Sequence, residues 1–298
     1  MPTIDLGAPP PTRRHAPGTL PALPRRITVT LPELCLVAER AGGAPLPFEV
    51  SDPTTADATG LGGRLGVSPA AVDAEAYAAA RSALHDPQSS LSRRGLLVDT
   101  VLDEGLLGAV GLLAKADVAV DLDVRAGTSR VVAWHRQRGG AVASLATADG
   151  LVYEIAWFAS DQWAGELARV ARLPEDVALR SSVVPDRADL PYELLDAAVE
   201  AGRTGRSDLL SVLVSDLSVI TVLTALTSES QGRLRAMVAD VSGDDTSVVG
   251  VVSWVLLADG WRALRPRRAD GVDRVVVDRV EPADLARELA PVLAEVKR

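Results

Sequence analysis

Residues 118–158 read VAVDLDVRAGTSRVVAWHRQRGGAVASLATADGLVYEIAWF, and this stretch decides the fold. Apolar and polar residues alternate from Val118 to Arg125, which is the period of a strand with one buried face. The connections that follow are short, and Asp149-Gly150 suits a tight turn that needs positive φ. Strands joined so closely are antiparallel neighbours, so a meander is predicted. Its four strands are expected at 118–124, 130–137, 141–147 and 151–158.

The second half of the chain repeats this plan. Both meanders contain Ala-Asp-Gly before their last-but-one or last strand, at Ala148-Asp149-Gly150 and Ala258-Asp259-Gly260, and an acidic or proline-started helix follows each meander. We therefore predict an α+β fold with a central antiparallel sheet built from two pseudo-repeated meanders and flanked by helical bundles. Helices are expected at 31–41, 69–85, 103–115, 161–172, 191–201, 207–228 and from 282, and the second set of strands at 232–241, 247–257, 261–266 and 273–278.

The chain has 298 residues, enough for a substantial core. Residues 1–26 are rich in proline and arginine and are expected to form a disordered tail. Residues 27–298 are expected to form a single α/β domain with two half-repeats, at about 27–172 and 190–298.

Composition excludes several classes of protein. With 31 Lys+Arg against 40 Asp+Glu, the net charge of -9 argues against a nucleic-acid binder. A single cysteine, Cys35, excludes a disulfide framework and a cysteine-rich zinc site. The apolar stretch 209–227 carries Asp216 near its middle, which argues against membrane insertion. We expect a cytoplasmic protein.

Motifs for catalysis are not found in the sequence. The three histidines are too far apart in sequence to form a metal pair, and His135 is expected at the surface. Cys35 lies in an apolar helix and is expected to be a structural thiol. Asp121 and Asp123 share one face of a strand and could form an acidic pair. We predict a protein that is not an enzyme, with no catalytic, cofactor or metal site.

The order of these features resembles the EspG family, cytosolic chaperones of type VII (ESX) secretion in actinobacteria. The opening ITVTLPEL at 27–34, followed by Leu46-Pro47, resembles the family's strand, helix and Leu-Pro start. The segment RGLLV at 94–98 resembles its Arg-Gly-Leu signature. The run from Leu106 to Asp117, which precedes the first strand of the meander, completes the resemblance.

The resemblance implies a pseudo-twofold fold and binding of a secreted PE–PPE-type pair at the helical tip of the PPE partner. It also implies contacts through the loop after the first meander strand, here 126–130, and through the C-terminal helical bundle, here about 191–229. Leu213, Leu217 and Ile220 would share one side of a helix at 207–228, at i, i+4 and i+7. The candidate contact residues are Gly127, Thr128, Arg130, Leu213, Leu217 and Ile220.

Three hypotheses follow. The first is a cytosolic chaperone or adaptor that binds a helical secreted protein of PE–PPE or WXG100-like type and keeps it soluble for export. The second is an enzyme or small-ligand-binding α+β protein with carboxylates such as Asp121 and Asp123 in an acidic pocket. The third is a structural interaction module unrelated to secretion.

Overall fold

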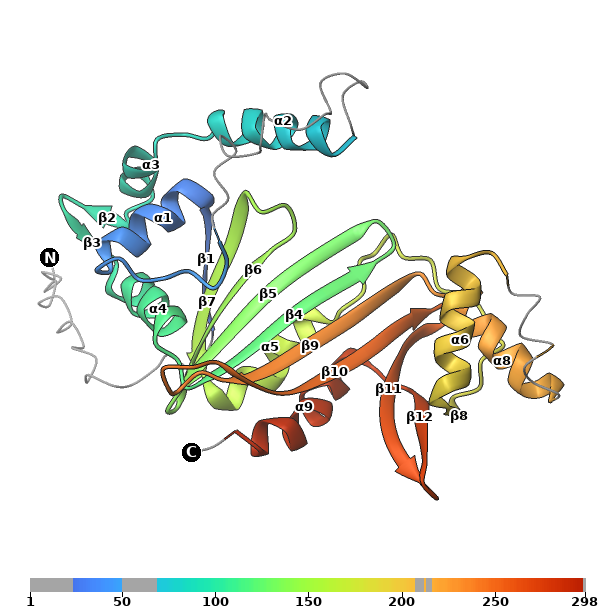
Figure 1. Ribbon diagram of the computed structural model, residues 1–298. Helices are drawn as coiled ribbons and strands as arrows, with labels where there is room; N and C mark the ends of the chain where they lie inside the picture. The colour runs from blue at the N-terminus through green and yellow to red at the C-terminus, as the bar shows by residue number, and fades with distance from the viewer. Residues whose placement is uncertain (1–23, 50–68, 207–211, 213–215, 297–298) are drawn as a thin grey trace, which may run out of the picture.

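Ten strands form one antiparallel sheet in the order β1-β7-β6-β5-β4-β9-β10-β11-β12-β8 (Figure 1). The computed structural model describes residues 24–49, 69–206, 212 and 216–296. The strands are β1 (Arg25–Thr30), β4 (Val118–Ala126), β5 (Ser129–Arg138), β6 (Ala141–Thr147), β7 (Val152–Ala159), β8 (Arg187–Pro191), β9 (Gly232–Asp240), β10 (Ser247–Leu257), β11 (Gly260–Ala269) and β12 (Val272–Arg279).

The two halves of the sheet have equivalent strand orders when each is read inward from its own edge, β1-β7-β6-β5-β4 and β8-β12-β11-β10-β9. In each half an edge strand, β1 or β8, pairs with the last strand of a four-stranded meander. The first strands of the two meanders, β4 and β9, pair with each other at the centre, where Leu122 lies opposite Ala236. The predicted fold, two pseudo-repeated meanders fused into one sheet with flanking helices, is therefore confirmed.

Two helices cover one face of the sheet. α5 (Trp163–Val170) follows the 3-10 turn η3 (Ser160–Gln162), and α9 (Leu285–Ala294) follows the equivalent turn η5 (Pro282–Asp284). Their apolar sides pack on the inward side chains of the central strands, including Leu122 and Ala236. α9 lies so close to β10 that a Cβ placed on Gly250 would be 2.7 Å from Cγ1 of Val292.

Two helical lobes lie on the other face, one over each half (Figure 1). The first lobe packs on β6 and β7 through residues such as Leu145 and Ile155. The second packs on the opposite half through Leu257 and Val277. The first lobe contains α1 (Leu31–Arg40), α2 (Pro69–Ser82), α3 (Pro87–Arg93), the hairpin β2 (Leu97–Val98) and β3 (Val101–Leu102), and α4 (Glu104–Ala114); the second contains α6 (Tyr192–Arg203) and α8 (Leu217–Ser228).

The structure corrects several expected boundaries. β1 begins at Arg25, so the last two residues of the expected tail 1–26 belong to the sheet, and residues 1–23 lie outside the described part. α3, the hairpin β2–β3 and the edge strand β8 were not expected. These elements have two to seven residues, too few to show a hydrophobic period.

The expected single helix at 207–228 is also wrong. Asp216 is extended, with φ -85° and ψ 109°, and its carboxylate accepts a hydrogen bond from the Ser218 amide at 2.8 Å. An aspartate with this geometry is the N-cap of a helix that starts at the next residue, so α8 begins at Leu217. Within the described ranges, the helices are too short or too polar to cross a bilayer.

Candidate functional site

The middle of the lobe-side face of the sheet lies between the two helical lobes. Alternation along β4 turns Val120, Leu122 and Val124 toward α5 and α9, and turns Asp121 and Asp123 the other way. We call this surface the open face because several of its side chains are exposed to solvent. It is formed by Asp121, Asp123 and Arg125 on β4, Arg130 and Val132 on β5, Arg233, Arg235 and Met237 on β9, and Val248, Val251 and Ser253 on β10.

One end of the open face is apolar. Met237 lies between Asp121 of β4 and Val251 of β10 in the register of the sheet. Val251 is 39% exposed and Val248, at a bulge in the β9–β10 pairing, is 55% exposed. Exposed aliphatic side chains on a central strand of a ten-stranded sheet favour covering by a partner.

The other end of the open face is basic. The Asp123 carboxylate lies 3.1 Å from Arg130, 3.6 Å from Arg233 and 3.8 Å from Arg125. Arg235 is directly opposite Asp123 in the β4–β9 register. Three guanidinium groups thus lie within 4 Å of one carboxylate, and a fourth arginine is its neighbour on the next strand, in a protein whose net charge is -9. The excess of positive charge favours a partner that carries an acidic group at this end of the open face.

The predicted contact residues are not gathered at one place. Gly127 has φ 59° in the β4–β5 turn, and its amide donates to the Gln231 carbonyl at 2.9 Å, just beyond the end of α8. Thr128 is exposed in the same turn, and Arg130 belongs to the basic end of the open face. These three residues therefore lie together at one end of the sheet.

The predicted residues of the C-terminal bundle lie elsewhere. Leu217 begins α8 and is 78% exposed, whereas Ile220 is half-buried against the core of its lobe. Twelve residues of helix at 1.5 Å each place Leu217 roughly 18 Å from the end of α8 nearest the turn. Leu213 lies outside the described residues.

Sequence reasoning missed Arg233, Arg235, Met237 and Val251. The signal was present, because Arg233 and Arg235 alternate with apolar Leu234 and Ala236 along a predicted strand. Alternation shows that two faces differ in polarity. It does not show that helices leave the middle of one face uncovered.

The acidic-pair hypothesis finds little support in the geometry. Asp121 and Asp123 do share a face, but Asp121 lies 2.5 Å from Arg136, and Asp123 is surrounded by arginines. Carboxylates already paired with guanidinium groups are poorly placed to ligate a metal or move a proton. Among the described residues, no three His, Cys, Asp or Glu side chains are grouped to hold a metal ion.

His135 is buried, contrary to the expectation of a surface residue. It lies on the α5–α9 side of β5, only 1% exposed, and its Nδ1 accepts a hydrogen bond from Trp163 Nε1 at 3.0 Å. Burial, reinforced by the charges of Arg169 and Arg136, lowers the pKa of His135 to about 3. The imidazole is therefore neutral and structural. Cys35 is half-buried, and burial raises its thiol pKa, which suits an unreactive packing residue.

No family model and no curated protein matches the chain. Among solved structures, it is similar to the Mycobacterium tuberculosis type VII secretion system chaperone EspG5, solved in complex with the PE25–PPE41 dimer. The match covers 92% of this chain and 97% of that chain, with a TM-score of 0.58 and 12% sequence identity. The resemblance seen in the sequence is thereby confirmed at the level of the fold.

Proposed function

We propose that this chain is a cytosolic chaperone that binds a helical secreted protein of PE–PPE type and keeps it soluble for export. The observation that carries the proposal is the open face, which offers exposed aliphatic side chains beside a cluster of arginines. Its fold is that of a chaperone solved with a PE–PPE dimer, which makes such a pair the first candidate partner. A WXG100-like helical protein is the second.

The physical task of such a chaperone is to cover an apolar helical surface of the partner. Burying Val248, Val251 and Met237 against that surface removes apolar area from water on both proteins, which drives association. The arginines at the other end of the face fix the orientation of the partner and speed encounter with an acidic group. No bond is made or broken, so the proposed activity needs no catalytic group.

Co-expression with PE–PPE and WXG100-like pairs from the same genome tests the proposal. We expect a stable complex in size-exclusion chromatography, and loss of the complex in the double variant Val251→Asp, Arg235→Glu. The matched control is Val272→Asp, Arg287→Glu, which makes the same changes at the tip of the β11–β12 hairpin and on α9. Failure of all candidate pairs to associate, or equal loss in both variants, would contradict the proposal.

A further inference from the structure

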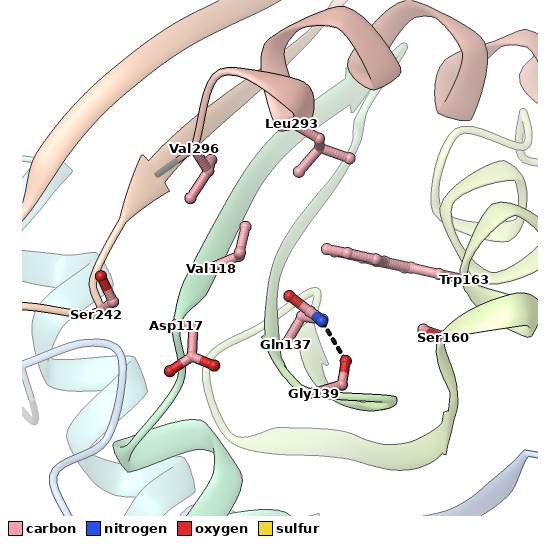
Figure 2. Close-up of a pocket in the computed structure, with 9 residues that line it drawn as sticks. All are labelled: Asp117, Val118, Gln137, Gly139, Ser160, Trp163, Ser242, Leu293 and Val296. Carbon is pink, nitrogen blue, oxygen red and sulfur yellow. Dashed lines mark hydrogen bonds between the residues drawn. The ribbon is translucent and has the colours of Figure 1, made fainter. Parts of the chain in front are cut away.

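A cavity of about 740 Å³ lies at one end of the sheet, on the side of α5 and α9 and thus away from the open face (Figure 2). The indole of Trp163 forms one wall, and Leu293 and Val296 close it from the side of α9. Val118 lies on the strand side, and Ser242 lies at the rim. The cavity therefore combines apolar walls with a polar rim, which is the usual character of a ligand site.

The pseudo-repeat gives every part of this cavity a counterpart in the other half. Val118 is the first residue of β4 and pairs with Gln137, and Gly232 is the first residue of β9 and pairs with Leu256. Val118 therefore corresponds to Gly232, and Gln137 to Leu256. Counting along the paired strands, Gly139 therefore corresponds to Ala258. Likewise Trp163, the first residue of α5, corresponds to Leu285, the first residue of α9.

The counterpart of the cavity is filled by the chain itself. The segment 173–180, which follows α5, places Leu173 and Val177 against the central core. A Cβ on Gly127 would lie 3.8 Å from Cγ2 of Val177. Further along, the Arg180 amide donates a hydrogen bond of 2.7 Å to the Ala258 carbonyl. An apolar side chain and a backbone amide thus anchor this segment.

The cavity offers the same two anchors. Trp163, Leu293 and Val296 surround the apolar space, and the Gly139 carbonyl is at the place of the Ala258 carbonyl. The side-chain amide of Gln137 donates to Gly139, and a carbonyl oxygen can accept a second donor. The charged side chain in the lining is Asp117, which disfavours an acidic ligand.

We propose that this cavity binds an extended, non-acidic peptide segment of another polypeptide, seated as residues 173–180 are seated in the other half. A β-branched or similar apolar side chain enters the space beside Trp163 and Leu293, and a backbone amide of the segment donates to the Gly139 carbonyl. This site is separate from the open face, so it does not depend on the function proposed above.

The probe is the capped, fluorescently labelled octapeptide Leu-Pro-Ser-Ser-Val-Ala-Leu-Arg. It reproduces residues 173–180 with serine in place of the exposed Glu175 and Asp176, which removes repulsion by Asp117. Fluorescence anisotropy with the full chain is expected to show saturable binding. Replacing the valine of the peptide by aspartate is expected to weaken binding at least about tenfold, because a charge would enter the apolar space.

A variant pair locates the binding. Ser242→Trp fills the rim of the cavity and is expected to weaken binding of the peptide at least about tenfold. Ser253→Trp, the same change on the open face, is expected to leave it unchanged. The proposal is wrong if the peptide does not bind at about 1 mM, if the valine-to-aspartate peptide binds equally well, or if Ser242→Trp has no effect. The same titration is made with a chain from which Lys297 and Arg298 have been removed. The proposal is also wrong if the peptide binds this shortened chain but not the full chain.

Discussion

Nη1 of Arg94 lies 3.2 Å from the carboxylate of Glu33, a side chain that is only 1% exposed. Glu33 also accepts a hydrogen bond from the Thr30 amide at 2.7 Å, while its own amide donates to the Thr30 hydroxyl, a capping box that starts α1. Arg94 donates in addition to the Thr28 carbonyl of β1. Arg94 thus joins the edge strand, the first helix and the end of α3 through one ion pair and one hydrogen bond.

Arg94→Met tests this contact. The substitution removes the arginine but leaves a buried carboxylate with fewer partners, so the free energy of unfolding should fall by about 2–3 kcal/mol. Arg93→Met, at an exposed neighbouring arginine, should change it by less than about 0.5 kcal/mol. Urea unfolding of both variants is the measurement. Equal stability of the two variants would show that the pair contributes nothing.

His135 predicts a pH dependence of stability. Its pKa is lowered to about 3 in the folded protein, against 6.5 as the ordinary value, so the unfolded chain binds a proton first as the pH falls. The stability from this residue is therefore present above pH 6.5 and is lost below it, by about 2 kcal/mol between about pH 7.5 and 5.

Comparison with His135→Phe isolates this effect. The variant should be less stable at neutral pH, because Trp163 loses its acceptor, but its free energy of unfolding should vary less between the two pH values. His85→Gln, at an exposed histidine, should keep the wild-type profile. If His135→Phe and wild type lose stability in parallel, His135 is not the group responsible.

The close approach of β10 and α9 predicts a coupled pair of substitutions. Gly250→Ala would place a methyl group 2.7 Å from Cγ1 of Val292 and should destabilise the protein by about 1–3 kcal/mol. Val292→Ala alone removes part of the core and should also destabilise it, by about 1–2 kcal/mol. The double variant should be more stable than the sum of the two predicts, by at least about 0.5 kcal/mol in a double-mutant cycle. Strict additivity would mean that the two side chains do not compete for space.

Arg262 is buried completely and should be essential to the second half. Its Nη2 lies 3.0 Å from Asp259, a residue of the β10–β11 turn, and the same group reaches the Val184 carbonyl before β8. Arg262→Met should lower the free energy of unfolding by about 2–4 kcal/mol and increase proteolysis near residue 184. Arg268→Met, on the exposed hairpin, is the control and should have little effect.

Much of the fold could be predicted from local pattern. The eight meander strands show a clear two-residue period or short glycine turns, and the recurrence of whole elements in the same order indicated two like halves. The two Ala-Asp-Gly turns themselves are not equivalent, because Ala148-Asp149-Gly150 joins β6 to β7 whereas Ala258-Asp259-Gly260 joins β10 to β11. β8 was missed because Pro191 looks like a helix start, although the pseudo-repeat requires a partner for β12 equivalent to β1. The break at Asp216 was missed because its apolar neighbours continue a helical pattern on both sides.

The site was less predictable, because it depends on contacts between distant segments. His135 is followed by Arg136 and Arg138 in the sequence, which suggested an exposed position, but Trp163, 28 residues later, covers it. The basic end of the open face joins Arg130 of one half to Arg233 and Arg235 of the other through the β4–β9 pairing. The pairing of whole strands across the pseudo-twofold axis creates that cluster, and local pattern does not predict it.

Site-specific photo-cross-linking tests the central claim most directly. Benzoylphenylalanine is placed at Val251 on the open face, or at Val272 on the β11–β12 hairpin, in the full chain co-expressed with its PE–PPE candidate. We expect irradiation to join the partner to the chain from position 251 and not from position 272. A complex that forms but cross-links from position 272, or from neither position, would contradict binding at the open face.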